Sequence, residues 1–124
     1  MHLISTEAAP AAIGPYSQAV CAGGFLFSSG QVALRTDGSL VEGDASTQAV
    51  QVFSNLDAVL AAAGCNRNSV VKCVVYLTDM NDFAAVNTVY ADWFGEHRPA
   101  RACVEVSGLP KGVAVEIDLI AELA

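Results

Sequence analysis

The chain has 124 residues, of which 53% are hydrophobic and 15% charged, whereas soluble domains typically contain about 25% charged residues. This length suits one domain spanning residues 1–124, and the shortage of solvating side chains predicts that another subunit covers part of an apolar surface. The net charge of −7 argues against nucleic acid as the main partner, because the chain would repel phosphate backbones.

The N-terminal segment and the cysteines indicate a cytoplasmic protein. The opening stretch, MHLISTEAAPAAIGP, has neither the basic segment nor the continuous apolar segment of a secretion signal, and no apolar run approaches a membrane span. The cysteines lack metal-ligand spacing, so we expect reduced thiols at Cys21, Cys65, Cys73 and Cys103. Two lone histidines, His2 and His97, do not predict a zinc site.

The first half of the chain predicts a hairpin followed by a helix. After a short strand at 2–5, strands are expected at about 17–22 and 25–32, joined at Gly23-Gly24 because the turn needs residues that tolerate positive φ. A turn-rich loop surrounds Asp37-Gly38. A helix should begin after Asp44, a suitable N-cap, and should end at Gly64.

The second half predicts three strands and a second helix. SVVKCVVYLTD, residues 69–79, has the pattern of a strand buried on both faces. A helix beginning near Asn81-Asp82 has one apolar face, and the strands RACVEVSG at 101–108 and GVAVEIDLIAE at 112–122 close the chain. The order β-β-α-β-α-β-β predicts an α+β fold, with both helices on one face of a mixed sheet.

Period-two alternation assigns the residues of the last two strands to the two faces of this sheet. We expect Ala102, Val104 and Val106 beneath the helices. The opposite face would then carry polar residues among small ones, a composition suited to a cleft between subunits: Arg101, Cys103, Glu105 and Glu116. Phe25 and Phe27 are expected in the core.

Four blocks carry a family resemblance: APAAIGPYSQAV at 9–20, FSSGQV at 27–32, DMNDFAAVNTVY at 79–90 and PARACVEVSGLPKGVAVEIDLIAE at 99–122. Over nearly its entire length the chain resembles the RidA/YjgF family of reactive-intermediate deaminases. The resemblance implies a chorismate-mutase-like domain, assembled as a homotrimer with a central β-barrel and active sites between subunits. It implies hydrolysis of 2-enamino and 2-imino acids, such as 2-aminoacrylate and 2-aminocrotonate with their imine tautomers, to 2-keto acids and ammonia, without metal or organic cofactor.

The resemblance makes Arg101 the residue that binds the substrate, and its chemistry agrees. An arginine fork matches a planar carboxylate through two parallel charge-assisted hydrogen bonds, whereas lysine would keep the charge and lose the fork. The alternative is a surface arginine or an intersubunit salt bridge with Glu105 or Glu116. Glu116 matches the family's glutamate on the final strand that positions the attacking water, and it could also be the salt-bridge partner of Arg101.

Four further residues are expected around the substrate by the same resemblance. Cys103 would form the pocket wall, because no paired histidine is evident to activate it as a nucleophile. Tyr16 would close over the substrate, or would be an amphipathic interface residue. Ser29 could contact the carboxylate, and Asn87 could equally be a structural hydrogen-bonding residue.

The chain departs from the family at one loop. Only GEHRPAR separates the second helix from the following strand, where many members have several more residues, so the cleft rim and the substrate range could differ. Arg98 in this rim is either a second carboxylate contact or a solvated charge. Two other functions stay open: a regulatory module that binds keto acids without turnover, and a chaperone-like or RNA-cleaving protein, although acidity and the lack of a histidine pair oppose RNA cleavage.

Overall fold

The computed structural model describes all 124 residues and has six strands and two α-helices in one α+β unit. The helices are α1 (Ala45–Ala62) and α2 (Phe83–Phe94). The strands are β1 (His2–Ile4), β2 (Ala19–Ala22), β3 (Phe25–Ser28), β4 (Val70–Leu77), β5 (Ala100–Glu105) and β6 (Val115–Glu122). Short 3-10 turns cover Arg67–Ser69, Met80–Asp82 and Pro110–Gly112.

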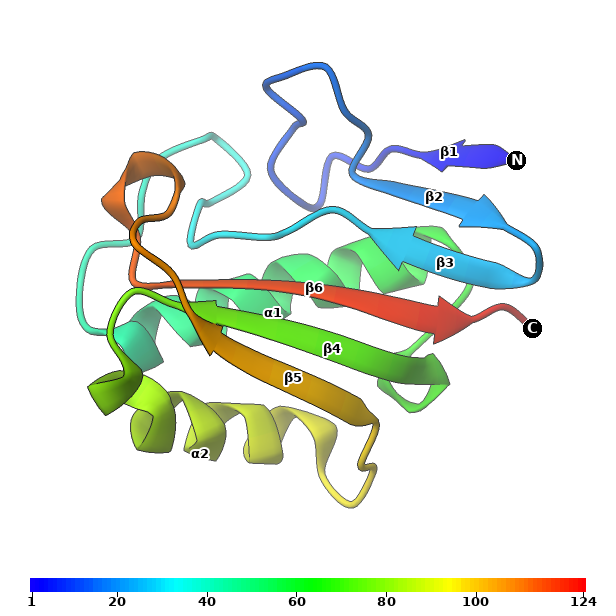
Figure 1. Ribbon diagram of the computed structural model, residues 1–124. Helices are drawn as coiled ribbons and strands as arrows, with labels where there is room; N and C mark the ends of the chain where they lie inside the picture. Colours follow the sequence, from blue (N-terminus) through cyan, green and yellow to red (C-terminus); the bar gives the residue numbers. More distant parts are fainter.

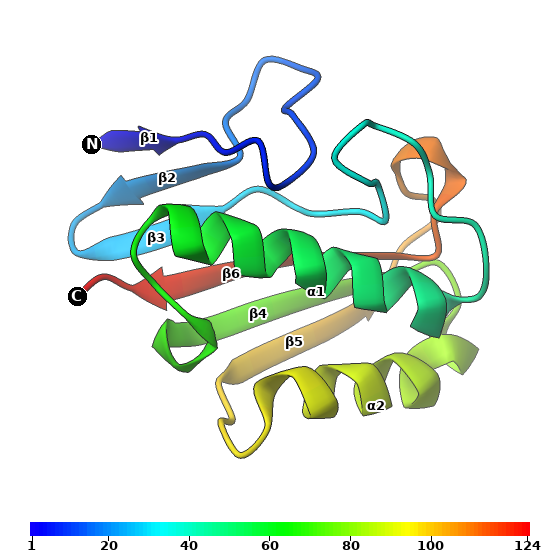
Figure 2. The same cartoon turned by 180° about the vertical axis from the view of Figure 1, so that it is seen from behind.

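The strands form one mixed sheet in the order β1-β2-β3-β6-β4-β5. Only β4 and β5 run parallel, since α2 makes the crossover between them, and every other neighbouring pair is antiparallel. Both helices pack against the same face of the sheet: α1 lies behind the strands in Figure 1 and in front of them in Figure 2, and α2 lies alongside the edge strand β5 in both views. The predicted fold class and element order are therefore confirmed.

Local signals in the sequence set the element boundaries. The Asp44 side chain caps α1 by accepting a hydrogen bond from the Thr47 N–H at 2.9 Å, and Gly64 follows the helix with φ of 73°. The β2–β3 turn uses Gly23 and Gly24 with φ of 61° and 87°, values that side chains other than glycine rarely adopt. These three predictions are confirmed.

The core lies between the helices and one face of the sheet. Alternate residues of β4 and β6 are almost fully buried there, and they meet the stripe of α1 that contains Val52, Leu56 and Val59. Aromatic rings close the gap between the helices, with Phe53 stacked on Trp93 at 4.6 Å between ring centroids. No helix has the length and apolar character needed to cross a membrane.

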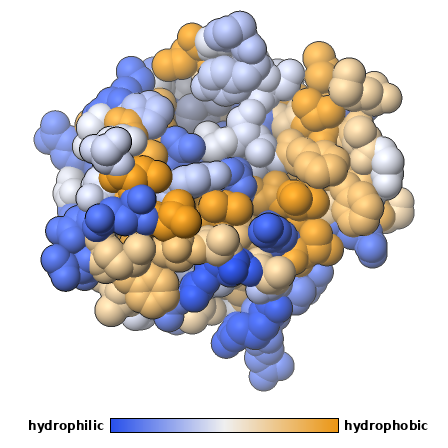
Figure 3. All heavy atoms as spheres, in the orientation of Figure 1, coloured by the Kyte–Doolittle hydropathy of each residue, from blue (hydrophilic) through white to orange (hydrophobic).

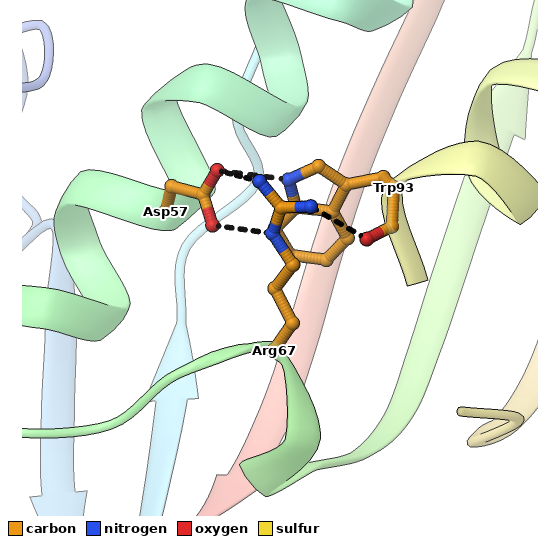
Figure 4. A network of polar contacts seen from close by, with 3 residues as sticks. All are labelled: Asp57, Arg67 and Trp93. Carbon is orange, nitrogen blue, oxygen red and sulfur yellow. Dashed lines mark hydrogen bonds and ion pairs between the residues drawn. The ribbon is translucent and has the colours of Figure 1, made fainter. Parts of the chain in front are cut away.

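A polar clasp outside this core joins both helices (Figure 4). Arg67 donates to both carboxylate oxygens of Asp57 on α1, at 3.1 and 2.9 Å, and to the Trp93 carbonyl of α2 at 2.8 Å. The Trp93 indole N–H also donates to Asp57 at 2.9 Å, and the Arg67 guanidinium lies 4.9 Å from the Trp93 ring centroid. Four hydrogen bonds thus link the three side chains and the Trp93 carbonyl across the two helices.

The face assignment predicted for β5 is wrong. Cys73 pairs with Arg101 and Val75 pairs with Cys103 in the parallel register, so Arg101 and Cys103 share the helix-covered face with these buried β4 residues. Ala102 and Val104 lie on the opposite face and are exposed. Glu116 is on that opposite face, as predicted, because it pairs with Tyr76.

The sheet face away from the helices, called the open face from here on, has no cover within the chain. Strand β4 is therefore buried on one face only, contrary to the prediction of burial on both. Phe25, Phe27 and Val104 remain 36%, 44% and 41% exposed, so the prediction that the two phenylalanines are core residues is wrong for the single chain. Figure 3 shows apolar side chains spread across this face, interrupted by polar ones.

Strand β3 ends earlier than the sequence predicts, because the pairing with β6 contains a bulge. Phe27 pairs with Ile120, and Gln31 forms a bridge with Ile117, so four residue steps on one side span three on the other. Within the bulge the Leu119 N–H bonds to the Ser28 hydroxyl at 2.9 Å instead of to a backbone carbonyl. The bulge places Ser29 and Gly30 beside the first residues of β6, where Gly30 lies against Glu116.

Candidate active site

Arg101 sits on a platform of aromatic and amide side chains from α2. Its guanidinium carbon lies 4.7 Å from the centroid of the Tyr90 ring and 5.4 Å from that of Phe83. Its Nη1 donates a hydrogen bond to the Asn87 side-chain oxygen at 2.6 Å. These residues and Cys103 are called the Arg101 cluster.

No carboxylate neutralises Arg101 within the chain. The only ion pair in the structure joins Arg67 and Asp57. Glu105 instead accepts a hydrogen bond from the Met80 backbone N–H at 2.8 Å, and Glu116 faces the other side of the sheet. Within one chain the charge of Arg101 therefore remains available for an anion, and the predicted alternative of a salt bridge to Glu105 or Glu116 of another subunit stays open.

The Arg101 guanidinium borders a hollow between α2 and the start of β5, with a volume of about 510 Å³. Its lining is Asn87, Tyr90, Ala91, Arg98, Pro99 and Arg101. The Arg98 side chain turns back to the carbonyls of Gly95 and His97 at the end of α2. The short loop thus brings a second cation to the rim but directs it to backbone acceptors.

Cys103 is the second member of the cluster that the sequence singles out. Burial raises the pKa of its thiol, and the nearby Arg101 charge only partly opposes this, so the thiol is protonated at neutral pH. It lines a small internal cavity together with Phe83 and Tyr90. This placement fits a wall residue. No three His, Cys, Asp or Glu side chains gather closely enough to hold a metal ion.

Glu116 belongs to a separate group on the open face, the Glu116 cluster, with Gly30, Tyr76 and Asp118. Burial raises the pKa of the Glu116 carboxyl, and the negative charge of Asp118, two residues along the same face, raises it further. Asp118 itself accepts a hydrogen bond from the Tyr76 hydroxyl at 3.0 Å. No hydrogen bond within the chain holds the Glu116 carboxylate, which rests against the backbone of Gly30.

Ser29 and Tyr16 lie near the Glu116 cluster. The Ser29 hydroxyl donates to the Ser17 carbonyl at 2.6 Å, and the Ser29 N–H donates to the Gln18 carbonyl at 3.0 Å. These bonds tie the loop that carries Tyr16 to the bulge, while Tyr16 itself remains 53% exposed. Within the chain Ser29 therefore has a structural partner, and Tyr16 is free to contact another molecule.

The structure thus separates the predicted site residues into two groups. Arg101, Asn87 and Cys103 lie on the helix-covered face, whereas Glu116, Ser29 and Tyr16 lie at the open face or in the loops beside it. Glu116 and Arg101 are two strands apart and offset by three residues in register, which puts their Cα atoms about 14 Å apart at standard strand spacings. They point to opposite faces, so one subunit cannot place both on the same small substrate.

Sequence reasoning missed three contributors to these clusters. The apolar face of the second helix suggests only core packing; Tyr90 is indeed in the core and Phe83 packs against it, but their rings also form the platform beneath Arg101. Their spacing could have revealed this, because Phe83, Asn87 and Tyr90 recur at intervals of four and three residues along one helix face. Gly30 could not be found this way, because its role depends on a contact with Glu116 that is remote in sequence.

Comparisons with known proteins agree with this architecture along the whole chain. Residues 6–123 match the family model described as Endoribonuclease L-PSP, and the chain belongs to this family, the RidA/YjgF proteins. It is 55% identical to a RutC family protein of Synechocystis sp., over 99% of this chain and 97% of that protein. It is 51% identical to the 2-iminobutanoate/2-iminopropanoate deaminase of Mus musculus, over 96% of this chain and 89% of that protein. The solved structure of Escherichia coli TdcF with bound serine is similar at a TM-score of 0.94, with 41% identity and full coverage of both chains.

Proposed function

We propose that the protein is a hydrolytic deaminase that converts reactive 2-enamino and 2-imino acids to 2-keto acids and ammonia. Its substrates would be 2-aminoacrylate with its tautomer 2-iminopropanoate, and 2-aminocrotonate with its tautomer 2-iminobutanoate. The observation that carries the proposal is Arg101, a guanidinium fixed on aromatic rings without a neutralising acid. The relative from Mus musculus that is 51% identical is named for this reaction.

Arg101 would bind the carboxylate that all these substrates share. Asn87 occupies only Nη1, so the edge formed by Nε and Nη2 remains free to donate to both carboxylate oxygens. The rings of Phe83 and Tyr90 hold the guanidinium plane in place before the substrate arrives, which lowers the entropy lost on binding. Cys103 would form the wall beside this carboxylate.

Glu116 would position and activate the water that attacks the imine carbon. Water oxygen would bond to C2 as Glu116 accepts a water proton and the C=N π pair moves to nitrogen; Glu116 then passes that proton to the nitrogen, which gives a neutral carbinolamine. The carbinolamine hydroxyl would next give its proton to Glu116, which delivers it to the nitrogen as the C–N bond breaks, releasing ammonia and the 2-keto acid and restoring the carboxylate. The raised pKa of Glu116 suits both steps, because the group must accept and then release a proton.

The two clusters would meet only in an assembly, and we propose a homotrimer with a central β-barrel and sites between subunits. One subunit would contribute the Arg101 cluster, and its neighbour would contribute Glu116 together with Ser29 and Tyr16. The open face supports this, because Phe25, Phe27 and Val104 expose apolar surface that association would cover. Four free thiols are consistent with our further proposal of a cytoplasmic location.

A coupled assay tests this function. A threonine dehydratase is incubated with threonine, and 2-ketobutyrate release is followed with and without the protein. We expect faster release with wild type, loss of acceleration with Arg101→Ala, and normal acceleration with Arg35→Ala, in which an exposed arginine of the 35–40 turn is removed. Light scattering on all three proteins would show whether assembly is intact.

Two results would replace the proposal. If the wild type assembles and binds 2-ketobutyrate through Arg101 but does not accelerate release, the protein is a binding module. If Phe27→Glu leaves the protein trimeric and fully active, the open face is not the interface. RNA cleavage, the activity in the family description, has no comparable support: the chain is acidic, His2 lies on the edge strand opposite β5, and the His97 ring is bonded to the Val70 carbonyl at 2.7 Å.

A further inference from the structure

Gly30 occupies a position where the backbone conformation itself does not require glycine. It is absent from the glycines with positive φ, unlike Gly23 or Gly24, so an alanine could adopt its dihedral angles. The reason for glycine must therefore be sought in the space around it.

That space is filled by Glu116. A Cβ atom added to Gly30 would lie 2.7 Å from the carboxyl carbon of Glu116, closer than a methyl group can approach, and 3.0 Å from its Cγ, at the limit of real contacts. The clash involves the outer half of the side chain and not only its tip. A residue larger than glycine would therefore force the whole carboxylate to move.

The surrounding backbone cannot relieve this clash. Gln31, next to Gly30, and Ile117, next to Glu116, exchange both backbone hydrogen bonds at 2.9 and 3.1 Å. Ser29 on the other side of Gly30 is held by bonds to Ser17 and Gln18. Since the two backbones are fixed against each other, the Glu116 side chain is the part that must yield.

No hydrogen bond in the chain fixes the Glu116 side chain, so packing against Gly30 determines its position. Its neighbour Asp118 is engaged by Tyr76, and its own oxygens have no donor in the chain. We propose that Gly30 is a positioning residue: the absent side chain leaves the niche that holds the Glu116 carboxylate in its reactive place. This inference rests on the proposed role of Glu116.

A double-mutant cycle tests it. Gly30→Ala should lower kcat roughly 100-fold, the scale expected for a catalytic group displaced by about 1 Å, while affinity for 2-ketobutyrate changes little. Glu116→Asp shortens the side chain and withdraws it from the niche. In that background Gly30→Ala should change kcat by less than about threefold, so the two substitutions would be strongly non-additive. Gly108→Ala is the matched control, because Gly108 has open space around its Cα and no positive φ.

A second measurement does not depend on turnover. Carboxyl-labelled glutamate is titrated by NMR, with the Glu116 signal assigned through Glu116→Gln. Displacement into solvent should lower the Glu116 pKa in Gly30→Ala toward that of an ordinary glutamate, with no change in Gly108→Ala. An unchanged titration, or an equal loss of kcat in both backgrounds of the cycle, would overturn the positioning role. Absence of wild-type turnover would instead remove the deaminase proposal, and the titration would still show whether Gly30 places Glu116.

Discussion

Arg67 and Arg101 occupy similar surroundings and differ in one partner. Each guanidinium lies over an aromatic ring of α2 and donates to an acceptor, but Arg67 faces the carboxylate of Asp57 and Arg101 faces the amide of Asn87. The carboxylate in Figure 4 neutralises Arg67 and occupies two of its donor nitrogens. The amide orients Arg101 without neutralising it. An aromatic platform therefore fixes an arginine, and its polar partner decides whether the charge serves the fold or a ligand.

The largest effect on activity should come from replacing Arg101 with lysine, and the same replacement of Arg67 is the control. Arg101→Lys keeps the charge and loses the fork, so kcat/KM for imine hydrolysis should fall about 100-fold. Arg67→Lys should leave kcat/KM near the wild-type value, because the side-chain hydrogen bonds of Arg67 go to Asp57 and Trp93, outside the Arg101 cluster. The coupled dehydratase assay measures both variants. Full activity of Arg101→Lys would show that the fork does not matter.

Removing the clasp should affect stability and spare catalysis. Arg67→Ala deletes the ion pair, the bond to the Trp93 carbonyl and the ring contact, and should lower the free energy of unfolding by about 1–2 kcal/mol. Urea denaturation at fixed protein concentration measures this, since association contributes to stability. A fall in kcat of the folded protein would contradict a purely structural role.

Replacing the amide partner of Arg101 with a carboxylate should make Arg101 resemble Arg67, whose charge is neutralised within the chain. Asn87→Asp places a carboxylate beside Arg101 and should weaken 2-ketobutyrate binding about 10-fold, because the ligand must displace an internal anion. Asn87→Ala removes the same hydrogen bond without adding charge and should weaken binding less. Calorimetric titration compares the two variants. Equal losses of 2-ketobutyrate affinity in the two variants would mean that the added negative charge has no effect on binding.

The smallest expected effect concerns the Glu116 cluster. Burial and then the Asp118 charge raise the Glu116 pKa, and hydrolysis needs the ionised carboxylate, so kcat/KM should fall as pH drops through this pKa. Asp118→Asn removes one negative charge and lowers the pKa, so the acid limb of the profile should move to lower pH. The amide oxygen introduced by this substitution can still accept from the Tyr76 hydroxyl, which preserves the local packing. An acid limb that stays in place would mean that another group controls it.

Most of the fold could be predicted from sequence because its signals are local. The cap at Asp44, the glycine turn at 23–24 and the period of α1 depend on residues within a few positions of one another. The face of β5 could not be predicted in this way. Alternation shows that Arg101 and Ala102 point to opposite faces of the sheet, and apolar character favoured Ala102 for the helix-covered face. Arg101 lies there instead, because the aromatic rings of α2 provide a contact for its guanidinium that the sequence pattern does not reveal.

The sequence offered a set of candidate site residues without their arrangement. Arg101, Asn87 and Cys103 do gather, and Ser29 does lie beside the neighbourhood of Glu116. Their division between two faces depends on strand order and register, which arise from contacts between distant parts of the chain. The role of Gly30 depends on a bulge whose two sides are 86 positions apart, as Gln31 and Ile117 show.

The position of β6 sets the order in which the molecule can be completed. This strand lies between β3 and β4, so the N-terminal hairpin and the β4–α2–β5 unit share no sheet contact without it. Residues 70–105 can form the platform for Arg101 soon after they leave the ribosome, since their contacts are close in sequence. The niche of Glu116 and the joined sheet must wait until β6 has been made. A nascent chain that stops before residue 115 would therefore carry two unpaired inner strand edges, at β3 and β4, which a chaperone could shield from other chains.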